Sequence, residues 1–216
     1  MLTSTPAIKN RFRGYLPVII DIESGGFNAK KDALLEIAAV TIIMDEQGIL
    51  KLDTTVHFHI NPFEGANLES SALLFNKIDP YHPFRFAVPE KQAITELFKL
   101  IRKKTQEADC QRAILTGHNP AFDLAFLNAA VERCAIKRNP FHSFSCLDTA
   151  TLSALAVGQT VLAKAVKSVN LPFDPEQAHS ALYDATQTAE LFCAIVNKWQ
   201  ELEGWSSKTE TSVFEK

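Results

Sequence analysis

The chain has 216 residues, 46% of them hydrophobic, and a formal net charge of −3 at pH 7. These values suit one globular domain with a sizeable core, and they exclude a chain that is basic throughout, so any phosphate-binding surface must be a local patch. No segment approaches the roughly 20 continuous apolar residues of a membrane-spanning helix. The N-terminal segment also lacks the apolar run of a secretory signal. We therefore expect a cytoplasmic protein that is not bound to a membrane.

The first third of the chain predicts strands. After a loose arm over residues 1–10, we expect strands at Leu16–Ile22, Leu34–Met44 and Leu52–Ile60. The first two are rich in β-branched residues, and the third alternates apolar and polar residues. Because the connections between them are short, these strands are expected to form an antiparallel meander.

The rest of the chain predicts mainly helices. The apolar spacing of Pro89–Lys104 is helical, Arg112–Thr116 reads as a short strand, and Pro120–Arg133 reads as a helix with Asn119 as its cap. Further helices are expected at residues 147–157, 159–169 and 180–199, before a disordered tail at 206–216. The order βββ-α-β-α-α-α predicts a single α/β domain over residues 11–205, with a mixed central β-sheet flanked by α-helices.

The four cysteines are far apart and form no CxxC pair. We expect free thiols in a reducing compartment rather than disulfides or zinc ligands, at positions Cys110, Cys134, Cys146 and Cys193.

Two carboxylates lie at the end of the first predicted strand. Asp21 and Glu23 are two residues apart, so both side chains leave the same face, while Ile20 and Ile22 point into the core. Carboxylates held side by side at an apolar strand end repel each other and lose solvation, and a cation removes both costs. A solvated strand end without a cation remains the alternative for this pair.

Two further acidic positions open helices. Asp123 lies in the first turns of the middle helix, where a carboxylate also interacts favourably with the helix dipole. His179 and Asp184 introduce the last long helix. Five helical residues turn the chain by about 140°, so these two side chains converge only if His179 belongs to the preceding loop and Ser180 begins the helix.

The three acidic motifs together resemble the DEDDh 3′→5′ exonucleases. They are Asp-x-Glu after a strand, Asn-x-x-Phe-Asp before and into a middle helix, and His-x-x-x-x-Asp at a late helix. The resemblance runs from about Arg11 to Trp205 and implies a ribonuclease-H-like fold. The stretches FHINPFEGANL, KRNPFH, GQTVL and QAHSALYD further resemble the branch of this family that trims RNA 3′ ends.

The resemblance implies two Mg²⁺ ions, with Mn²⁺ as the alternative, in a metal centre formed by Asp21, Glu23, Asp123, His179 and Asp184. Two such ions activate water and stabilise the leaving oxygen, and hard oxygen ligands suit them. Within this centre His179 is expected to act as the general base, since a histidine can accept the proton of water near neutral pH.

Aromatic residues near these motifs have two interpretations. From the residues alone, core packing is the better one for Phe27, Phe75, Phe122 and Phe144. The resemblance instead matches these four to positions that stack on the terminal bases, and stacking tolerates any base sequence. Ser24 stands where the family has Thr, and Ser71 stands where it has a Glu four residues before Phe75, so a base preference that depends on that Glu is not expected here.

Four basic side chains that are separate in the sequence would be interpreted, from the residues alone, as ordinary solvated residues. The resemblance assigns nucleic-acid binding to Arg11, Arg13, Arg112 and Lys137, and it implies a homodimer in which this basic patch faces the partner's active site. A few arginines can bind phosphate despite the negative net charge.

The resulting hypothesis is a single-strand-specific 3′→5′ exoribonuclease that trims tRNA and other stable RNAs, also digests single-stranded DNA ends and releases nucleoside 5′-monophosphates. Two alternatives stay open from the sequence. One is a DNA proofreading exonuclease, and the other is an inactive ribonuclease-H-like module that binds nucleic acid.

Overall fold

The computed structural model describes residues 6–202. Its centre is a five-stranded sheet of order β3-β2-β1-β4-β5. The first three strands, β1 (Tyr15–Ser24), β2 (Leu34–Met44) and β3 (Leu50–His59), pair antiparallel as the predicted meander. The other two, β4 (Arg112–Gly117) and β5 (Phe141–Asp148), run parallel to β1. The sheet is therefore mixed, as expected.

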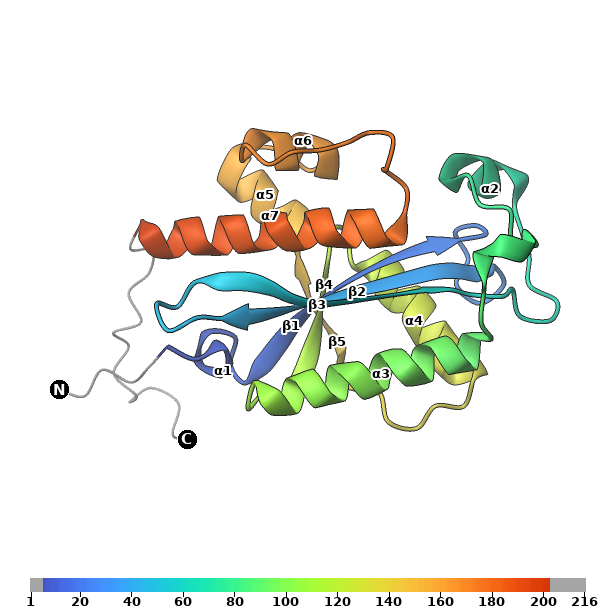
Figure 1. Ribbon diagram of the computed structural model, residues 1–216, viewed down its shortest axis with the longest axis horizontal. Helices are drawn as coiled ribbons and strands as arrows, with labels where there is room; N and C mark the ends of the chain where they lie inside the picture. The colour runs from blue at the N-terminus through green and yellow to red at the C-terminus, as the bar shows by residue number, and fades with distance from the viewer. Residues whose placement is uncertain (1–5, 203–216) are drawn as a thin grey trace.

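Helices cover both faces of this sheet (Figure 1). The helices α3 (Glu90–Glu107) and α4 (Ala121–Arg133) lie on one side, and the long α7 (Ala181–Glu201) crosses β1, β2 and β3 on the other. Two shorter helices, α5 (Thr149–Val157) and α6 (Leu162–Ser168), pack beside α7. Between β3 and α3 the chain forms α2 (Ser70–Asn76) and the short 3₁₀ helix η1 (Pro83–Arg85).

The core explains why these segments fold as they do. Every residue from Leu34 to Ile42 is buried, because β2 is the central antiparallel strand and has helices on both of its faces. A strand buried on both sides reads as a continuous apolar run rather than an alternating one. The predicted apolar face of α3 is confirmed, since Ile94, Leu97, Phe98 and Ile101 are all fully buried.

Three local features differ from the sequence expectations. The strand β5 follows α4 where none was expected; its register with β4 is irregular and most of its residues are only half-buried, so it lacks a clear apolar pattern. Helix α2 was also missed. Within the expected arm, Ile8–Arg11 forms the helix α1 and Ile8 is 6% exposed, so the loose arm is wrong for these residues. The expected tail at 206–216 lies outside the described residues.

All four cysteines are free within the described chain, as predicted. Over residues 6–202 no single helix is long and apolar enough to cross a membrane, although the bent pair α5 and α6 passes on length and composition.

Candidate active site

The carboxylates Asp21 and Glu23 project from the end of β1, on the face that α7 covers. Ile20 and Ile22 point the other way and are 1% and 6% exposed, as the two-residue periodicity predicts. The strand pairing places Glu23 directly opposite Glu36 of β2. Both acids of β1 are therefore held between an apolar core and the beginning of α7.

Asp123 reaches the same strand from the first turn of α4. Its carboxylate is 6% exposed, and Oδ1 accepts a hydrogen bond of 3.1 Å from the backbone N–H of Ile22. The predicted Asn119 cap is wrong, because Pro120 occupies the N-cap position, while Asn119, with φ of 64°, donates its backbone N–H to Asp148. The side chain of Asn119 therefore has no part in placing Asp123.

His179 and Asp184 meet at the beginning of α7. Ser180 occupies the N-cap position, so His179 lies in the preceding loop, as the convergence of the two side chains requires. The φ of His179 is 66°, a left-handed conformation that costs energy for residues other than Gly and Asn. In this conformation its backbone N–H donates to Oδ2 of Asp184 at 3.1 Å. The imidazole itself remains exposed to solvent.

The acids converge closely enough to share cations. The carboxylate oxygens of Asp21, Glu23 and Asp184 lie within 4.8 Å of one another. Oδ1 of Asp184 is buried and has no hydrogen-bond partner among residues 6–202. A buried carboxylate oxygen that lacks a donor is costly in a folded protein unless a cation satisfies it. The donor set is all oxygen, which fits Mg²⁺ or Mn²⁺.

The electrostatics of the cluster agree with this fit. Burial, with the charges of Asp123 and Asp184, raises the pKa of Asp21 well above its ordinary value. Burial and the charge of Asp184 raise the pKa of Glu23 to about 8, and burial raises the pKa of Asp123 to about 7. The fold thus holds charges together at a cost that bound cations would remove.

These shifts predict a stability profile for the metal-free protein. Folded-state pKa values raised from 3.8–4.5 to about 7–8 mean that the folded chain binds more protons than the unfolded chain across this interval. Stability in EDTA should therefore fall as the pH rises from about 5 to about 8. Carboxylates whose pKa is lowered, such as Asp53 and Asp148, titrate below this interval. Calorimetry at both pH values should also show greater stabilisation by Mg²⁺ at the higher pH, whereas a melting temperature that rises with pH in EDTA would contradict the interpretation.

Three of the four predicted aromatic residues surround the acids. Phe27 is 83% exposed, and its ring centroid lies 6.1 Å from that of Phe122. Phe122 is half-buried against Phe126, with the ring centroids 4.9 Å apart. Phe75 is 64% exposed and packs on the imidazole of His179, with the two ring centroids 4.1 Å apart. The core interpretation is therefore wrong for Phe27 and Phe75, whose rings face solvent.

Phe144 lies elsewhere. It is 78% exposed on β5 and contacts His142, which in turn contacts Tyr15 at the first position of β1. Asp21 and Glu23 are six and eight residues beyond Tyr15 on β1, which corresponds to about 20 and about 26 Å along the strand. Within one chain, Phe144 is thus remote from the acids.

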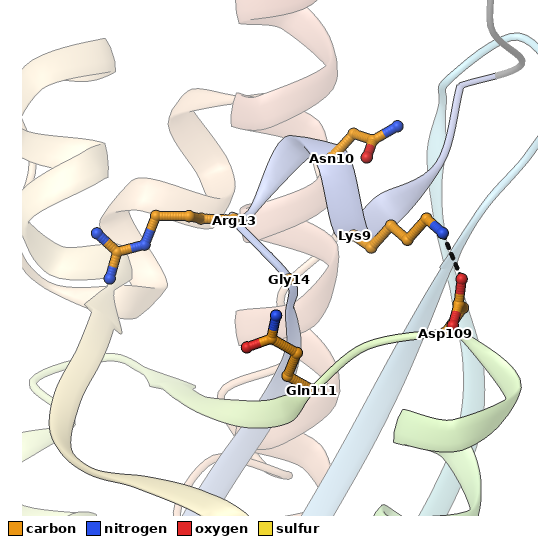
Figure 2. Close-up of a pocket in the computed structure, with 6 residues that line it drawn as sticks. All are labelled: Lys9, Asn10, Arg13, Gly14, Asp109 and Gln111. Carbon is orange, nitrogen blue, oxygen red and sulfur yellow. Dashed lines mark hydrogen bonds and ion pairs between the residues drawn. The ribbon is translucent and has the colours of Figure 1, made fainter. Parts of the chain in front are cut away.

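Like Phe144, three of the four predicted basic residues lie away from the acids. The guanidinium of Arg13 lies 5.7 Å from the ring centroid of Tyr15, and Arg112 of β4 pairs with Tyr15. Both side chains are exposed, and Arg13 borders a surface hollow with Lys9 and Gln111 (Figure 2). Lys137 is exposed in the connection between α4 and β5. We call Arg13, Arg112, Lys137 and Phe144 the distal patch.

Arg11 does not belong to this patch. Its guanidinium donates to the side chain of Gln200 at 3.0 Å and to the carbonyl of Val196 at 3.1 Å. Partial burial lowers its pKa. These contacts connect α1 to the C-terminal half of α7, and nucleic-acid binding by Arg11 stays a prediction.

Asn76 was not identified as a site residue from the sequence. This residue ends α2 and is 6% exposed, its side-chain amide donates to the carbonyl of Ser24 at 3.0 Å, and its closeness to Glu23 partly offsets the rise in the pKa of that carboxyl. It thereby holds the acidic strand end against the helix that carries Phe75. Ser71, one turn earlier on α2, is exposed.

Comparisons with known proteins find nuclease relatives for this chain. Residues 18–192 match the family model described as exonuclease. Ribonuclease T of Vibrio campbellii (strain ATCC BAA-1116) is 63% identical over 199 residues, which cover 92% of this chain and 93% of that protein. Ribonuclease T of Shewanella sp. (strain W3-18-1) is 58% identical over 198 residues, covering 92% and 89%.

Solved structures show the same fold at low identity. Exonuclease I of E. coli in complex with a dT13 oligonucleotide has a TM-score of 0.66 at 16% identity, over 88% of this chain and 42% of the longer relative. A 3′-exonuclease described with the histone mRNA stem-loop has a TM-score of 0.67 at 14% identity, over 90% and 66%. These neighbours support the expected ribonuclease-H-like architecture.

Proposed function

This chain belongs to the exonuclease family of the ribonucleases T and is a 3′→5′ exoribonuclease, and we propose that it trims the unpaired 3′ ends of tRNA and other stable RNAs. The observation that carries the proposal is the convergence of carboxylates from β1 and α7 beside exposed aromatic rings. A cluster of this kind without rings could cut anywhere along a strand. Rings beside it favour an unstacked terminal nucleotide.

The family is metal-dependent, and the proposed ligands are Asp21, Glu23, Asp123 and Asp184, with two Mg²⁺ ions or Mn²⁺ in their place. When bound, such ions supply a nucleophilic water and neutralise charge on the leaving 3′-oxygen. The protein contributes fixed positions for these oxygens: Asp123 is held by the backbone of Ile22, and Asp184 by the backbone of His179.

His179 is the proposed general base. Its backbone N–H orients Asp184, while its imidazole lies exposed on the ring of Phe75 and can receive the proton of the attacking water. The contact with Phe75 restricts where the imidazole can move. A substrate base that stacks on Phe75 would bring the scissile phosphate near the same imidazole.

Phe27, Phe75 and Phe122 are the proposed stacking residues for the terminal bases. Phe27→Ala and Phe122→Ala should each weaken binding of a single-stranded 3′ end by about 1–3 kcal/mol, since stacking contributes this much per base. Phe98→Ala is the matched control, because Phe98 is fully buried and such a substitution costs about 3–5 kcal/mol of stability. Affinity titrations and melting curves on the three variants separate the two effects. Strong destabilisation with unchanged affinity would assign Phe27 and Phe122 to the core.

We further propose that the enzyme is a homodimer and that the distal patch serves the partner's active site. Arg13, Arg112 and Phe144 lie together near the beginning of β1, whereas the acids lie near its end. A patch of cations beside an exposed ring suits a phosphate backbone and an unstacked base. Because the patch is remote from its own acids, a second chain would bring it to a substrate.

Mixing two inactive variants tests this arrangement. One carries Asp21→Asn and the other carries Arg13→Ala with Lys137→Ala. A mixed dimer has one intact acidic site facing one intact patch, so activity should return after subunit exchange. The difference in substrate affinity between the second variant and the parent should also become smaller as the salt concentration rises, since phosphate contacts gain free energy from the release of counterions. If the mixture stays inactive although mixed dimers form, the distal patch of each chain would serve the active site of the same chain.

The substrate is tested by competition between two 3′ ends. A tRNA with a short unpaired 3′ tail should be shortened in Mg²⁺ faster than a DNA primer with a mismatched 3′ end, and a single-stranded DNA tail should also be digested. Faster removal of the mismatched DNA nucleotide would instead indicate proofreading. Binding without cleavage of any substrate would indicate an inactive module.

A further inference from the structure

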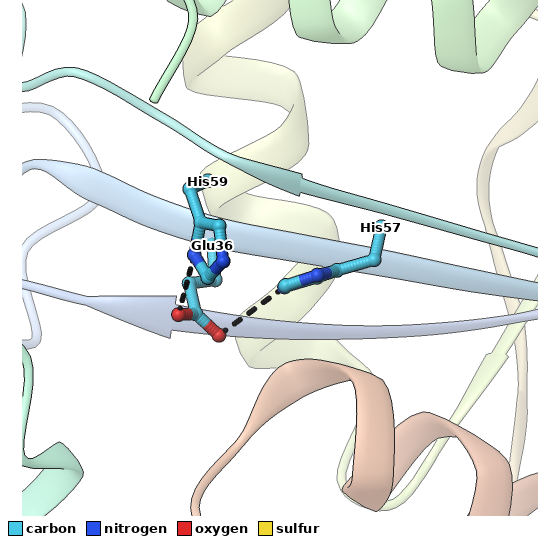
Figure 3. A group of neighbouring side chains, drawn as sticks. All are labelled: Glu36, His57 and His59. Carbon is cyan, nitrogen blue, oxygen red and sulfur yellow. Dashed lines mark hydrogen bonds and ion pairs between the residues drawn. The ribbon is translucent and has the colours of Figure 1, made fainter. Parts of the chain in front are cut away.

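A second group of side chains that could hold a metal ion consists of Glu36, His57 and His59 (Figure 3). Glu36 of β2 pairs directly with His59 of β3, and His57 is two residues earlier on the same face. Since Glu36 also lies opposite Glu23, this group occupies the face that α7 covers. It contains two imidazole nitrogens, which the acidic cluster of β1 and α7 lacks.

The geometry of the three side chains approaches that of a coordination site. Nδ1 of His59 lies 2.8 Å from one oxygen of Glu36, and Nε2 of His57 lies 3.4 Å from the other. In a tetrahedral zinc site, bond lengths near 2.0–2.1 Å place neighbouring ligand atoms about 3.3 Å apart. A His-x-His pair on one strand with a carboxylate on the next therefore presents three ligand atoms within 4.8 Å of one another, close enough to share one ion.

One atom of the group lacks a partner. Despite its closeness to Glu36, Nδ1 of His59 makes no hydrogen bond of acceptable geometry within the described chain, and it is buried. The carboxylate of Glu36 is also buried, at 7% exposure. A buried ring nitrogen that meets a carboxylate oxygen without a well-aligned hydrogen bond is costly, and an ion bound to both atoms would satisfy them.

The surroundings supply charge of both signs. Asp21 and Glu23 are close enough to interact electrostatically with Glu36, and they favour a cation. Arg85 interacts with Glu36 as well, but its guanidinium donates to the carbonyls of Leu35 and Pro80. The side chains of His57 and His59 keep 19% and 36% of their surface exposed, which leaves an approach for the ion and for a solvent ligand.

We propose that Glu36, His57 and His59 bind one transition-metal ion, with Zn²⁺ as the best fit, at a site separate from the catalytic carboxylates. Imidazole ligands select Zn²⁺ over Mg²⁺, which prefers oxygen donors alone. The site has three protein ligands and an open fourth position. The carboxylate of Glu36 lies close to the backbone N–H of Ala181, so the ion would also hold the beginning of α7, which places His179 and Asp184.

Zinc uptake in a background without the catalytic acids tests this proposal. The full chain carrying Asp21→Asn and Asp184→Asn is stripped with EDTA and dialysed against buffered ZnCl₂. We expect one equivalent of zinc. Adding His57→Gln or His59→Gln should weaken its binding by more than the roughly 10–100-fold that loss of an outer-shell partner costs. His82→Gln, at an exposed histidine of the η1 turn, is the matched control and should leave the uptake unchanged.

If a histidine variant does not fold, the visible absorption of Co²⁺ bound to the background variant, which keeps both histidines, still tests the proposal. Co²⁺ added to the same background should give the intense visible absorption of a tetrahedral site with nitrogen ligands. The proposal is overturned if the background binds no zinc, if both histidine variants retain the parent affinity, or if Co²⁺ gives only the weak spectrum of six oxygen ligands. These outcomes do not depend on whether the protein cleaves RNA.

Discussion

Asp21→Asn and Asp184→Asn are each expected to abolish cleavage while leaving the metal-free fold at least as stable as the parent. Each substitution removes one charge from a buried group of like charges, so the folded state loses repulsion and keeps nearly the same shape. The same change removes an oxygen ligand, so Mg²⁺ should bind more weakly in calorimetric titrations. A substitution that abolishes activity and raises stability indicates that the carboxylate has a catalytic rather than a structural role.

Asp45→Asn is the matched control for this pair. Asp45 lies in the turn between β2 and β3, and its hydrogen bond with Lys51 lowers its pKa. Removal of that charge should therefore reduce stability slightly and leave turnover unchanged. Near-normal turnover in either Asp21→Asn or Asp184→Asn would contradict the assignment of these residues as metal ligands.

His179→Ala should lower the rate by about 10²–10⁴, the usual contribution of a positioned general base, while single-stranded substrate still binds. The backbone complicates a simple alanine substitution, because residue 179 has a left-handed conformation that alanine disfavours. His179→Asn is therefore the better variant. Asparagine tolerates this conformation and keeps the backbone N–H that orients Asp184, but its amide cannot accept the proton.

Single-turnover rates of both variants between pH 6 and 9 distinguish a base from a structural residue. Similar large losses in the two variants, with the pH dependence of the parent flattened, assign the effect to the imidazole. If His179→Asn retained activity within a few-fold of the parent across this interval, His179 would serve only to orient Asp184.

The elements that could be predicted from the sequence are those with a strong local pattern. The strands β1 to β3 and the helices α3, α4 and α7 are long, and each has a clear apolar pattern or a continuous apolar run in its own sequence. The loop position of His179 could also be inferred, because two side chains five residues apart converge only when the first is outside the helix. Such features depend on short-range geometry alone.

The features that were missed depend on contacts between distant segments. The strand β5 is defined by its pairing with β4 rather than by its own apolar pattern. Arg11 and Arg13 are two residues apart, yet one bonds to α7 and the other faces solvent. The group of Glu36, His57 and His59 arises from strand register, and register cannot be read from one strand by itself.

The most direct test of the account follows the products of one purified reaction. A single-stranded RNA labelled at its 5′ end is incubated with the protein in Mg²⁺, in EDTA, and in Mg²⁺ with Asp21→Asn. We expect a ladder that shortens by one nucleotide at a time from the 3′ end, release of nucleoside 5′-monophosphates, and no product in EDTA or with the variant. Internal cuts that appear before the ladder, or equal cleavage in EDTA, would contradict it.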